Sequence, residues 1–209
     1  NLEDKPVSSD KKKKFNFQKT IQLSNISFSY NHEKKVFNNL NLSFEKGKVT
    51  LIKGKTGSGK STLISILMGL LPPDAGNLLV DKKIINEKNM PSWQNMISYM
   101  PQDSIILDKS LIENIIFFNP HDIEQKEVIK KLKIFNLEKF IDQYFNKSNY
   151  SLGEYGKNLS GGEKQRINFL RTLFEDKSIL ILDEPSSALD VTTTNKIFYD
   201  LKNNYKNLT

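Results

Sequence analysis

Cysteine is absent from the 209-residue sequence. A disulfide framework and a thiolate metal site are therefore excluded, and the composition is compatible with a reducing, cytoplasmic setting. The chain also lacks any apolar run near the roughly 18 residues that a membrane-spanning helix needs. No apolar stretch follows the lysine-rich opening, so we do not expect a signal peptide there. Ten glycines and seven prolines are ordinary, which disfavours collagen-like structure and broad disorder.

Acidic residues are outnumbered: 24 aspartates and glutamates stand against 31 lysines and arginines, a net charge of +7. Such a balance is typical of nucleic-acid-binding proteins. Here, however, the lysines are scattered, and the one dense cluster (residues 11–14) lies in a polar opening. We therefore expect no nucleic-acid partner and interpret residues 1–19 as a linker that follows a membrane domain. A basic segment that meets anionic lipid is the alternative.

The order of the patterns along the chain indicates an α/β fold. Alternating or apolar β-forming runs predict strands, and leucine and isoleucine at helical spacing predict helices. The predicted strands are 20–30, 39–48, 49–53, 76–80, 96–100 and 178–183. The predicted helices are 60–71, a helical region over 110–145 with no strand candidate, 163–174 and 192–205. Strands thus bracket a helical insertion of the size of a subdomain.

A glycine-rich loop follows the expected strand at 49–53. The run GKTGSGKS, residues 54–61, matches the phosphate-loop pattern G-x-x-x-x-G-K-[ST] and has a helix after it, as that motif demands. Its glycines let backbone amides approach phosphate oxygens, and Lys60 supplies a positive charge for the β- and γ-phosphates. The Ser61 hydroxyl is suited to ligate Mg²⁺. ATP and Mg²⁺ are therefore the predicted ligands.

A buried strand ending in carboxylates supplies the second element of such an ATPase. In ILILDEP, residues 179–185, four apolar residues place Asp183 at the carboxyl edge of the strand. Nucleotides bind at this edge in α/β sheets. We expect Asp183 to hold Mg²⁺ through water and Glu184 to orient or deprotonate the attacking water.

A second glycine-rich stretch, NLSGGEKQR at residues 158–166, stands before another helix. Two glycines at this place leave backbone N–H groups bare, which is a way in which proteins hold phosphate. The chain therefore carries two phosphate-binding loops far apart in sequence.

The phosphate loop, LSGGE, ILILDEP and SALD, in this order, resemble the nucleotide-binding domain of an ATP-binding cassette (ABC) ATPase. The resemblance implies a P-loop NTPase core with an antiparallel β subdomain and an inserted α-helical subdomain at about 104–160, within a domain over 20–209. It also implies head-to-tail dimers, in which the signature loop of one domain caps the ATP of the other. The second loop would then serve the partner's site, through Leu159, Ser160, Gly161, Gly162 and Glu163.

Other positions match the family's site residues. Tyr30 matches the aromatic residue that stacks on adenine, Gln102 the glutamine that contacts Mg²⁺ or the attacking water, and Asp190 the aspartate that communicates across the dimer. The implied ATP-binding residues are Tyr30, Gly54, Lys55, Thr56, Gly57, Ser58, Gly59, Lys60, Ser61 and Thr62. The implied catalytic residues are Glu184, Lys60 and Gln102, and the implied metal ligands are Ser61, Gln102 and Asp183.

The segment SLGEYGKNLSGG, residues 151–162, resembles the part of exporter-type members that touches the membrane domain. We therefore expect an ATPase domain that powers an exporter at the cytoplasmic face of the cell membrane. Its partners would be a second nucleotide-binding domain, as a homodimer, and a transmembrane domain in the same native chain. Two alternatives stay open: a soluble ABC ATPase acting on nucleic acid or ribosomes, and a non-catalytic regulatory cassette.

The family's switch histidine, which follows a further strand beyond the catalytic glutamate, has no counterpart here. The two histidines are His32, ahead of the phosphate loop, and His121, in the helical insertion. We expect that the segment with this histidine is missing by truncation, so that the isolated chain hydrolyses ATP weakly or not at all.

Overall fold

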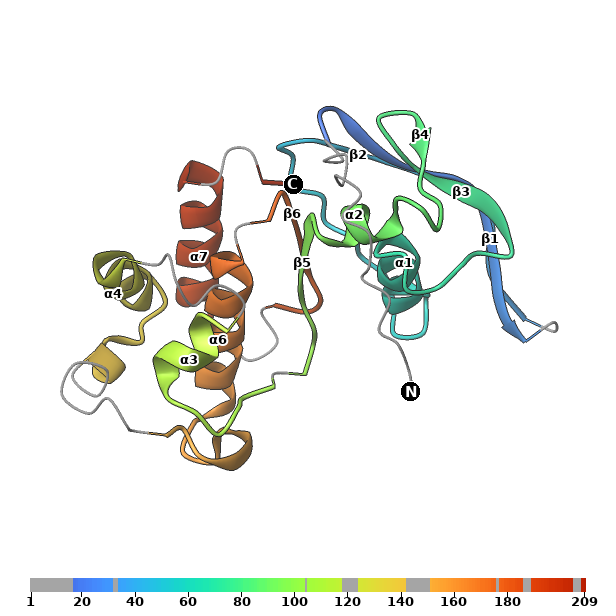
Figure 1. Ribbon diagram of the computed structural model, residues 1–209. Coiled ribbons are helices and arrows are strands. Elements are labelled where there is room, and N and C mark those ends of the chain that lie inside the picture. The colour runs from blue at the N-terminus through green and yellow to red at the C-terminus, as the bar shows by residue number, and fades with distance from the viewer. Residues whose placement is uncertain are drawn as a thin grey trace, which may run out of the picture. The chain divides into compact units, whose positions relative to one another are not determined.

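The computed structural model describes residues 17–31, 34–103, 105–117, 124–141, 151–175, 177–185, 189–204 and 208–209. His32, His121 and most of the expected linker lie outside these ranges. Two compact units divide the chain: the first comprises Asn1–Glu45 and Gly54–Met96, and the second comprises Lys46–Lys53 and Ile97–Thr209. The elements of each are labelled in Figure 1.

The first unit contains a four-stranded antiparallel sheet in the order β2-β1-β3-β4. Its strands are β1 (Thr20–Asn31), β2 (Lys34–Glu45), β3 (Ala75–Val80) and β4 (Lys83–Ile84). Alternate residues of β1, including Ile21, Leu23 and Phe28, are buried, because successive side chains of a strand point to opposite faces. The predicted antiparallel β subdomain is thereby confirmed.

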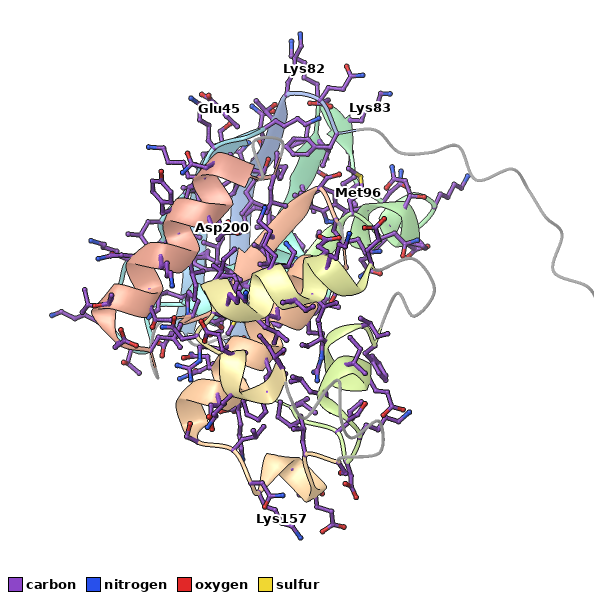
Figure 2. All side chains as sticks on the ribbon, turned by 90° about the vertical axis from the view of Figure 1, so that its left-hand side faces the viewer. Glu45, Lys82, Lys83, Met96, Lys157 and Asp200 are labelled. Carbon is purple, nitrogen blue, oxygen red and sulfur yellow. The ribbon has the colours of Figure 1, made fainter. Side chains whose placement is uncertain are left out.

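The turn after β3 fastens the start of β1. The carboxylate of Asp81 accepts hydrogen bonds from the backbone N–H groups of Gln18, Lys19 and Thr20 at 2.6–2.9 Å. Burial alone raises the pKa of Asp81, but these backbone hydrogen bonds outweigh it and hold the pKa below its ordinary value. Lys82 and Lys83, which follow, project outward from this turn (Figure 2).

Two helices complete the first unit, α1 (Lys60–Leu67) and α2 (Met90–Gln94). The fully buried Trp93 of α2 donates from its ring Nε1 to the Leu67 carbonyl oxygen at 2.9 Å, and thereby satisfies a carbonyl at the end of α1. The helix α1 ends earlier than the predicted limit at residue 71, because Gly69 has a φ of 69°. The short α2 and β4 were not predicted.

The second unit is built on two parallel strands, β5 (Ile97–Met100) and β6 (Ile179–Leu182). The long helix α6 (Gly161–Phe174) contacts β5, and α3 (Leu111–Ile115) contacts α6 (Figure 1). The Ser98 hydroxyl of β5 donates to the Thr172 carbonyl oxygen of α6 at 2.8 Å. Parallel strands covered by helices are the α/β arrangement expected from the sequence.

The region between β5 and α6 is helical where it is described. It contains α3, α4 (Gln125–Ile134) and the 3-10 turns η1 (Glu138–Phe140) and η2 (Glu154–Gly156), and α7 (Val191–Asn204) follows β6. Leu132, Phe135 and Leu170 are fully buried in one apolar cluster that these helices share with α6. The expected helical insertion is confirmed for its described part, and residues 118–123 and 142–145 of it lie outside the described ranges. No helix in the described ranges has the length and apolarity to cross a membrane.

The predicted strand at 49–53 is wrong. This segment has no strand structure, and Val49 and Leu51 are 81% and 73% exposed. A strand needs a free neighbouring edge, and β6 is already paired on one side with β5. On β6, the Leu180 N–H donates to the Thr209 carbonyl, and the Thr209 N–H donates to the Ser178 carbonyl. The apolar run therefore has no such edge at this part of β6.

Candidate functional site

The phosphate loop leads into α1 in the first unit. Gly59, the residue before α1, has a φ of 93°, and a Cβ there would lie 2.8 Å from the Val36 side chain. Only glycine fits this place without strain. No side chain in the described part of the chain caps the N-terminus of α1. Backbone N–H groups at an uncapped helix start are suited to bind an anion, because they carry the positive end of the helix dipole.

The lysine of this loop is held by the loop itself. The Lys60 ammonium donates to the carbonyl oxygens of Gly54 and Lys55, at 3.0 and 3.2 Å. At Gly54 a Cβ would come within 2.5 Å of the Ser58 hydroxyl, so the loop closes tightly at this end. Hydrogen bonds between ammonium and phosphate are stronger than those to neutral carbonyls, so a phosphate group would compete well for Lys60.

Tyr30 lies near the end of β1 with its side chain 65% exposed. Its hydroxyl and that of Thr62, in the first turn of α1, are 2.9 Å apart. Its ring meets that of Phe28 edge to face, with centroids 4.9 Å apart. The first unit thus brings together two members of the predicted ATP-binding set, Tyr30 and Thr62, and leaves an aromatic ring open for stacking.

The second unit brings two of the three predicted catalytic side chains, Gln102 and Glu184, into contact. The Gln102 amide donates to a Glu184 carboxylate oxygen at 3.0 Å. The Asp183 N–H donates to the Met100 carbonyl at 3.0 Å, so the β5–β6 pairing continues up to the carboxylates. Glu184 has a φ of 49°, in the left-handed region that residues other than glycine seldom adopt. Strained residues of this kind cluster at functional sites.

Tyr99 was not predicted, although it lies on the strand that leads to Gln102. Burial raises the pKa of its phenol, and the charge of Asp183 and a hydrogen bond to Asp183 add to this effect. Tyr99 is paired with Ile181 in the parallel register, so Asp183, two residues further on, shares its face of the sheet. The protonated phenol therefore helps to orient Asp183. Strand register, rather than any motif, is the signal that could have identified it.

The signature stretch begins α6 with a capping box. The Glu163 N–H donates to the Ser160 hydroxyl at 3.3 Å, and the Glu163 carboxylate accepts from the Ser160 N–H and hydroxyl at 2.8 and 2.9 Å. Glu163 also forms an ion pair with Lys139, which the sequence did not predict. Burial alone raises the pKa of Glu163, but hydrogen bonds from Lys139 and Ser160 outweigh it and lower the pKa below 4.5.

Gly161, by contrast, is not required by its own surroundings. A Cβ at this residue would meet no atom of the described residues within 4 Å, and its φ is not among the positive values. Ser160 and Gly161 are exposed, whereas Leu159 and Glu163 are buried. The exposed half of the signature stretch therefore presents a small, open surface at a helix N-terminus.

Asp190 begins α7. Its carboxylate accepts from the Thr193 N–H at 2.8 Å, in the manner of a helix cap. Hydrogen bonds from Thr193 are the main cause that lowers the pKa of Asp190. The structure thus gives Asp190 a capping role within the chain.

Oxygen donors are available for a magnesium ion. The Ser61 hydroxyl, the Gln102 amide and the Asp183 carboxylate are all hard oxygen ligands, the type that Mg²⁺ prefers. Across the described ranges, His, Cys, Asp and Glu form no group of three or more that could hold a metal. Ser61 belongs to the first unit, and Gln102 and Asp183 belong to the second. The described residues of either unit alone thus offer few ligands, and a magnesium ion would take the others from phosphate and water, as is usual for this ion.

Comparison with known proteins agrees with these features. Residues 37–187 match the family model described as ABC transporter. The chain is 36% identical over 187 residues to a Rickettsia typhi protein named for export, ATP binding and permease function, and covers 32% of that protein. It is 33% identical over 180 residues to the heavy metal tolerance protein of Schizosaccharomyces pombe, covering 22% of it. These alignments include 88% and 86% of this chain.

A solved structure is similar as well. It is described as a bacterial Atm1-family ABC exporter with ATP bound, and it matches with a TM-score of 0.81 and 28% identity over 91% of this chain and 33% of that one. The chain thus spans about a third or less of the length of these relatives. The Rickettsia protein and the solved structure are both named for export. One conclusion follows from the family match, the phosphate loop, the strand that ends in carboxylates and the helix that begins at the signature stretch. The chain belongs to the ABC transporter family, as its ATP-binding ATPase domain.

Proposed function

We propose that this domain binds ATP with Mg²⁺ and powers a membrane exporter, and that two such domains act head to tail. The observation that supports the dimer is Gly161, an exposed glycine that no described residue of the chain requires. A glycine whose smallness has no internal use is suited to admit a ligand from outside, here the triphosphate held by a second domain. Leu159 and Glu163 would fix the loop, while Ser160, Gly161 and Gly162 would contact that phosphate.

The proposed chemistry divides among few residues. Lys60 and the amides of the phosphate loop would neutralise the triphosphate, with Tyr30 stacked on the adenine. Ser61, Gln102 and Asp183 would hold Mg²⁺, which stabilises charge on the phosphates. Glu184 would orient or deprotonate the attacking water, and its contact with Gln102 supports this role, because a fixed carboxylate can align a water molecule. Asp190 is proposed to communicate across the dimer.

The exporter part of the proposal rests on the relatives and on one turn. The curated relatives named above are longer chains, and the Rickettsia protein is named for both ATP binding and a permease. In this chain Tyr155 is 83% exposed at a φ of 51°, between Gly153 and Gly156, which also have positive φ values. Such a strained turn with an exposed aromatic ring is suited to contact another protein segment. We therefore propose a transmembrane domain of the same native chain as the partner, at the cytoplasmic face of a membrane.

The test is Glu184→Gln in the full native protein, placed in lipid vesicles. Glutamine keeps the size of the side chain but is no base, so ATP turnover should fall by a factor of about 100 to 10,000. ATP binding should persist, and the variant should accumulate as an ATP-bound dimer. The matched control is Glu87→Gln, an exposed glutamate in the first unit, which should turn over ATP at the wild-type rate.

Other outcomes would decide against parts of the proposal. Unchanged turnover in Glu184→Gln would remove the role assigned to Glu184. Tight ATP binding without turnover in the wild type would indicate a regulatory cassette. Turnover stimulated several-fold by DNA, and unaffected by the membrane domain, would indicate a soluble ATPase that acts on nucleic acid.

A further inference from the structure

Gln165 of α6 reaches the backbone of Glu184. Its side-chain Nε2 donates to the Glu184 carbonyl oxygen at 3.1 Å. Gln165 is 3% exposed, although it is a polar residue on the helix that begins with the signature glycines. A glutamine amide so deeply buried is kept in place by its partners, because moving it would leave buried polar atoms unsatisfied.

Glu184 needs such support. It adopts a φ of 49° directly before Pro185, and a proline disfavours helical conformations in the residue that precedes it. A left-handed conformation at a residue other than glycine persists only where the surroundings enforce it. Two glutamines supply that enforcement: Gln165 holds the backbone carbonyl of Glu184, and Gln102 holds its carboxylate.

The position of Gln165 along α6 connects its contact with Glu184 to the signature loop. Gly161 is the first residue of α6, and Gln165 lies four residues later, about one turn along the same helix. Ser160 and Glu163 lock this first turn by their reciprocal hydrogen bonds. One rigid turn therefore joins the exposed signature surface to the backbone of Glu184.

We propose that Gln165 is a positioning residue for Glu184, and that it links the signature loop to the catalytic carboxylate of the same chain. This inference rests on the proposed function, in which the signature loop contacts the ATP of a partner domain and Glu184 acts on the ATP of its own. A shift of α6 on contact with the partner's nucleotide is then transmitted to Glu184. Each ATP site of the dimer thereby influences the other.

The experiment uses the full native protein and two substitutions of Gln165. Gln165→Met has a similar length and no donor, and Gln165→Glu has the same shape but no N–H. The matched control is Gln94→Met, because Gln94 of α2 likewise donates from its amide to a backbone carbonyl, that of Met68, at 3.3 Å. For each protein, kcat, KM and the affinity for ATP are measured, together with the effect of adding Glu184→Gln.

Both Gln165 variants should lower kcat about 10- to 100-fold, the loss expected when a catalytic group is misplaced by about 1 Å, with ATP affinity within twofold of wild type. Gln94→Met should leave kcat unchanged. Added to Glu184→Gln, Gln165→Met should lower the residual turnover less than twofold, because a residue that acts through Glu184 has no effect once that carboxylate is gone. A merely structural glutamine would not show this dependence.

Three results would overturn the inference. The first is wild-type kcat in both Gln165 variants. The second is loss of ATP affinity together with turnover, since Gln165 would then serve the fold. The third is a full, multiplicative loss in the double variant with Glu184→Gln. Absence of turnover in the wild type would instead overturn the proposed function, and this inference with it, so the two failures are distinguishable.

Discussion

The two glycine-rich loops of this chain both precede helices, yet they use glycine for different reasons. In the phosphate loop, Gly59 has a φ of 93°, and an added Cβ would lie 2.8 Å from Val36. In the signature loop, an added Cβ at Gly161 would meet nothing within 4 Å. The fold itself needs the first glycine. No described residue imposes such a need on the second, which supports the proposal that Gly161 serves a ligand held by a partner domain.

The helices that follow these loops also differ in how their N-termini are capped. Among the residues that the structure describes, no side chain caps α1, so the amides of its first turn are left for a ligand. At the start of α6, Ser160 and Glu163 satisfy each other's backbone N–H groups, and the capping box does not use those of Gly161 and Gly162. The phosphate loop is thus prepared to enclose an anion, and the signature loop is prepared to present a fixed surface to one.

Lys60→Ala tests the first half of this comparison and has the largest expected effect. This substitution removes the ammonium group that donates to the Gly54 carbonyl within the phosphate loop. ATP affinity should fall about 100-fold, because one charge-assisted hydrogen bond to phosphate is lost. Equilibrium binding of a fluorescent ATP analogue to the native protein measures this. Lys83→Ala, at the exposed start of β4, is the matched control and should bind normally. Normal ATP affinity in Lys60→Ala would show that the loop is not the ATP site.

Gly161→Ala tests the second half. The added methyl group would stand on the surface proposed for the partner's ATP, and turnover should fall about 10- to 100-fold through misplacement of the reacting groups. The fold should not suffer, because alanine is favoured over glycine in a helix by about 0.5–1 kcal/mol. Steady-state turnover and the melting temperature of the native protein are measured together.

Gly59→Ala sharpens the contrast, because it makes the same chemical change in the other loop. There the left-handed backbone costs alanine about 1–2 kcal/mol before any clash, so the melting temperature should fall. The comparison would fail if Gly161→Ala lost stability as Gly59→Ala does, or if it kept wild-type turnover.

The motif residues were predictable from sequence because each motif is local. The strand–loop–helix order around Lys60, the strand before Asp183 and the helix after Gly161 can all be recognised within a dozen residues. Periodicity likewise predicted β1, β3, β5, β6 and the helical insertion, since buried positions recur every two or about every 3.6 residues. The confirmed elements are those whose signal lies within their own sequence.

The features that were missed depend on residues distant in sequence. Tyr99 and Asp183 are brought together by strand register, and Lys139 reaches Glu163 from another element. The error at 49–53 has the same origin: an apolar run makes a strand only if a partner edge is free. Glu163 illustrates both cases. Its capping box with Ser160 lies within one helical turn, whereas its ion pair with Lys139 joins two distant parts of the sequence.

Glu163→Gln has the smallest expected effect. It removes the negative charge of residue 163 and keeps a side chain that can form the capping hydrogen bonds. Glutamine can also complete a capping box, so Ser160 should stay in place, while the ion pair with Lys139 is lost. Lys139 is largely exposed, so the first turn of α6 should open more easily by only about 0.5 kcal/mol at pH 7. Hydrogen exchange of the α6 amides in the native protein, corrected for intrinsic rates, measures this opening.

The pH dependence gives this small effect a definite sign. The pKa of Glu163 in the folded chain lies below the ordinary 4.5 that it regains on opening. Its charge therefore stabilises the turn fully above pH 4.5, and this stabilisation is lost as the pH falls through the lower, folded pKa. The difference between wild type and Glu163→Gln should then shrink on acidification. In the wild-type background, Lys139→Met should destabilise the first turn of α6 as much as Glu163→Gln does. In the Glu163→Gln background, it should cause no further destabilisation. A difference that stayed constant with pH would mean that glutamine disturbs the cap itself, and that the signature loop depends on the shape of residue 163 and not on its charge.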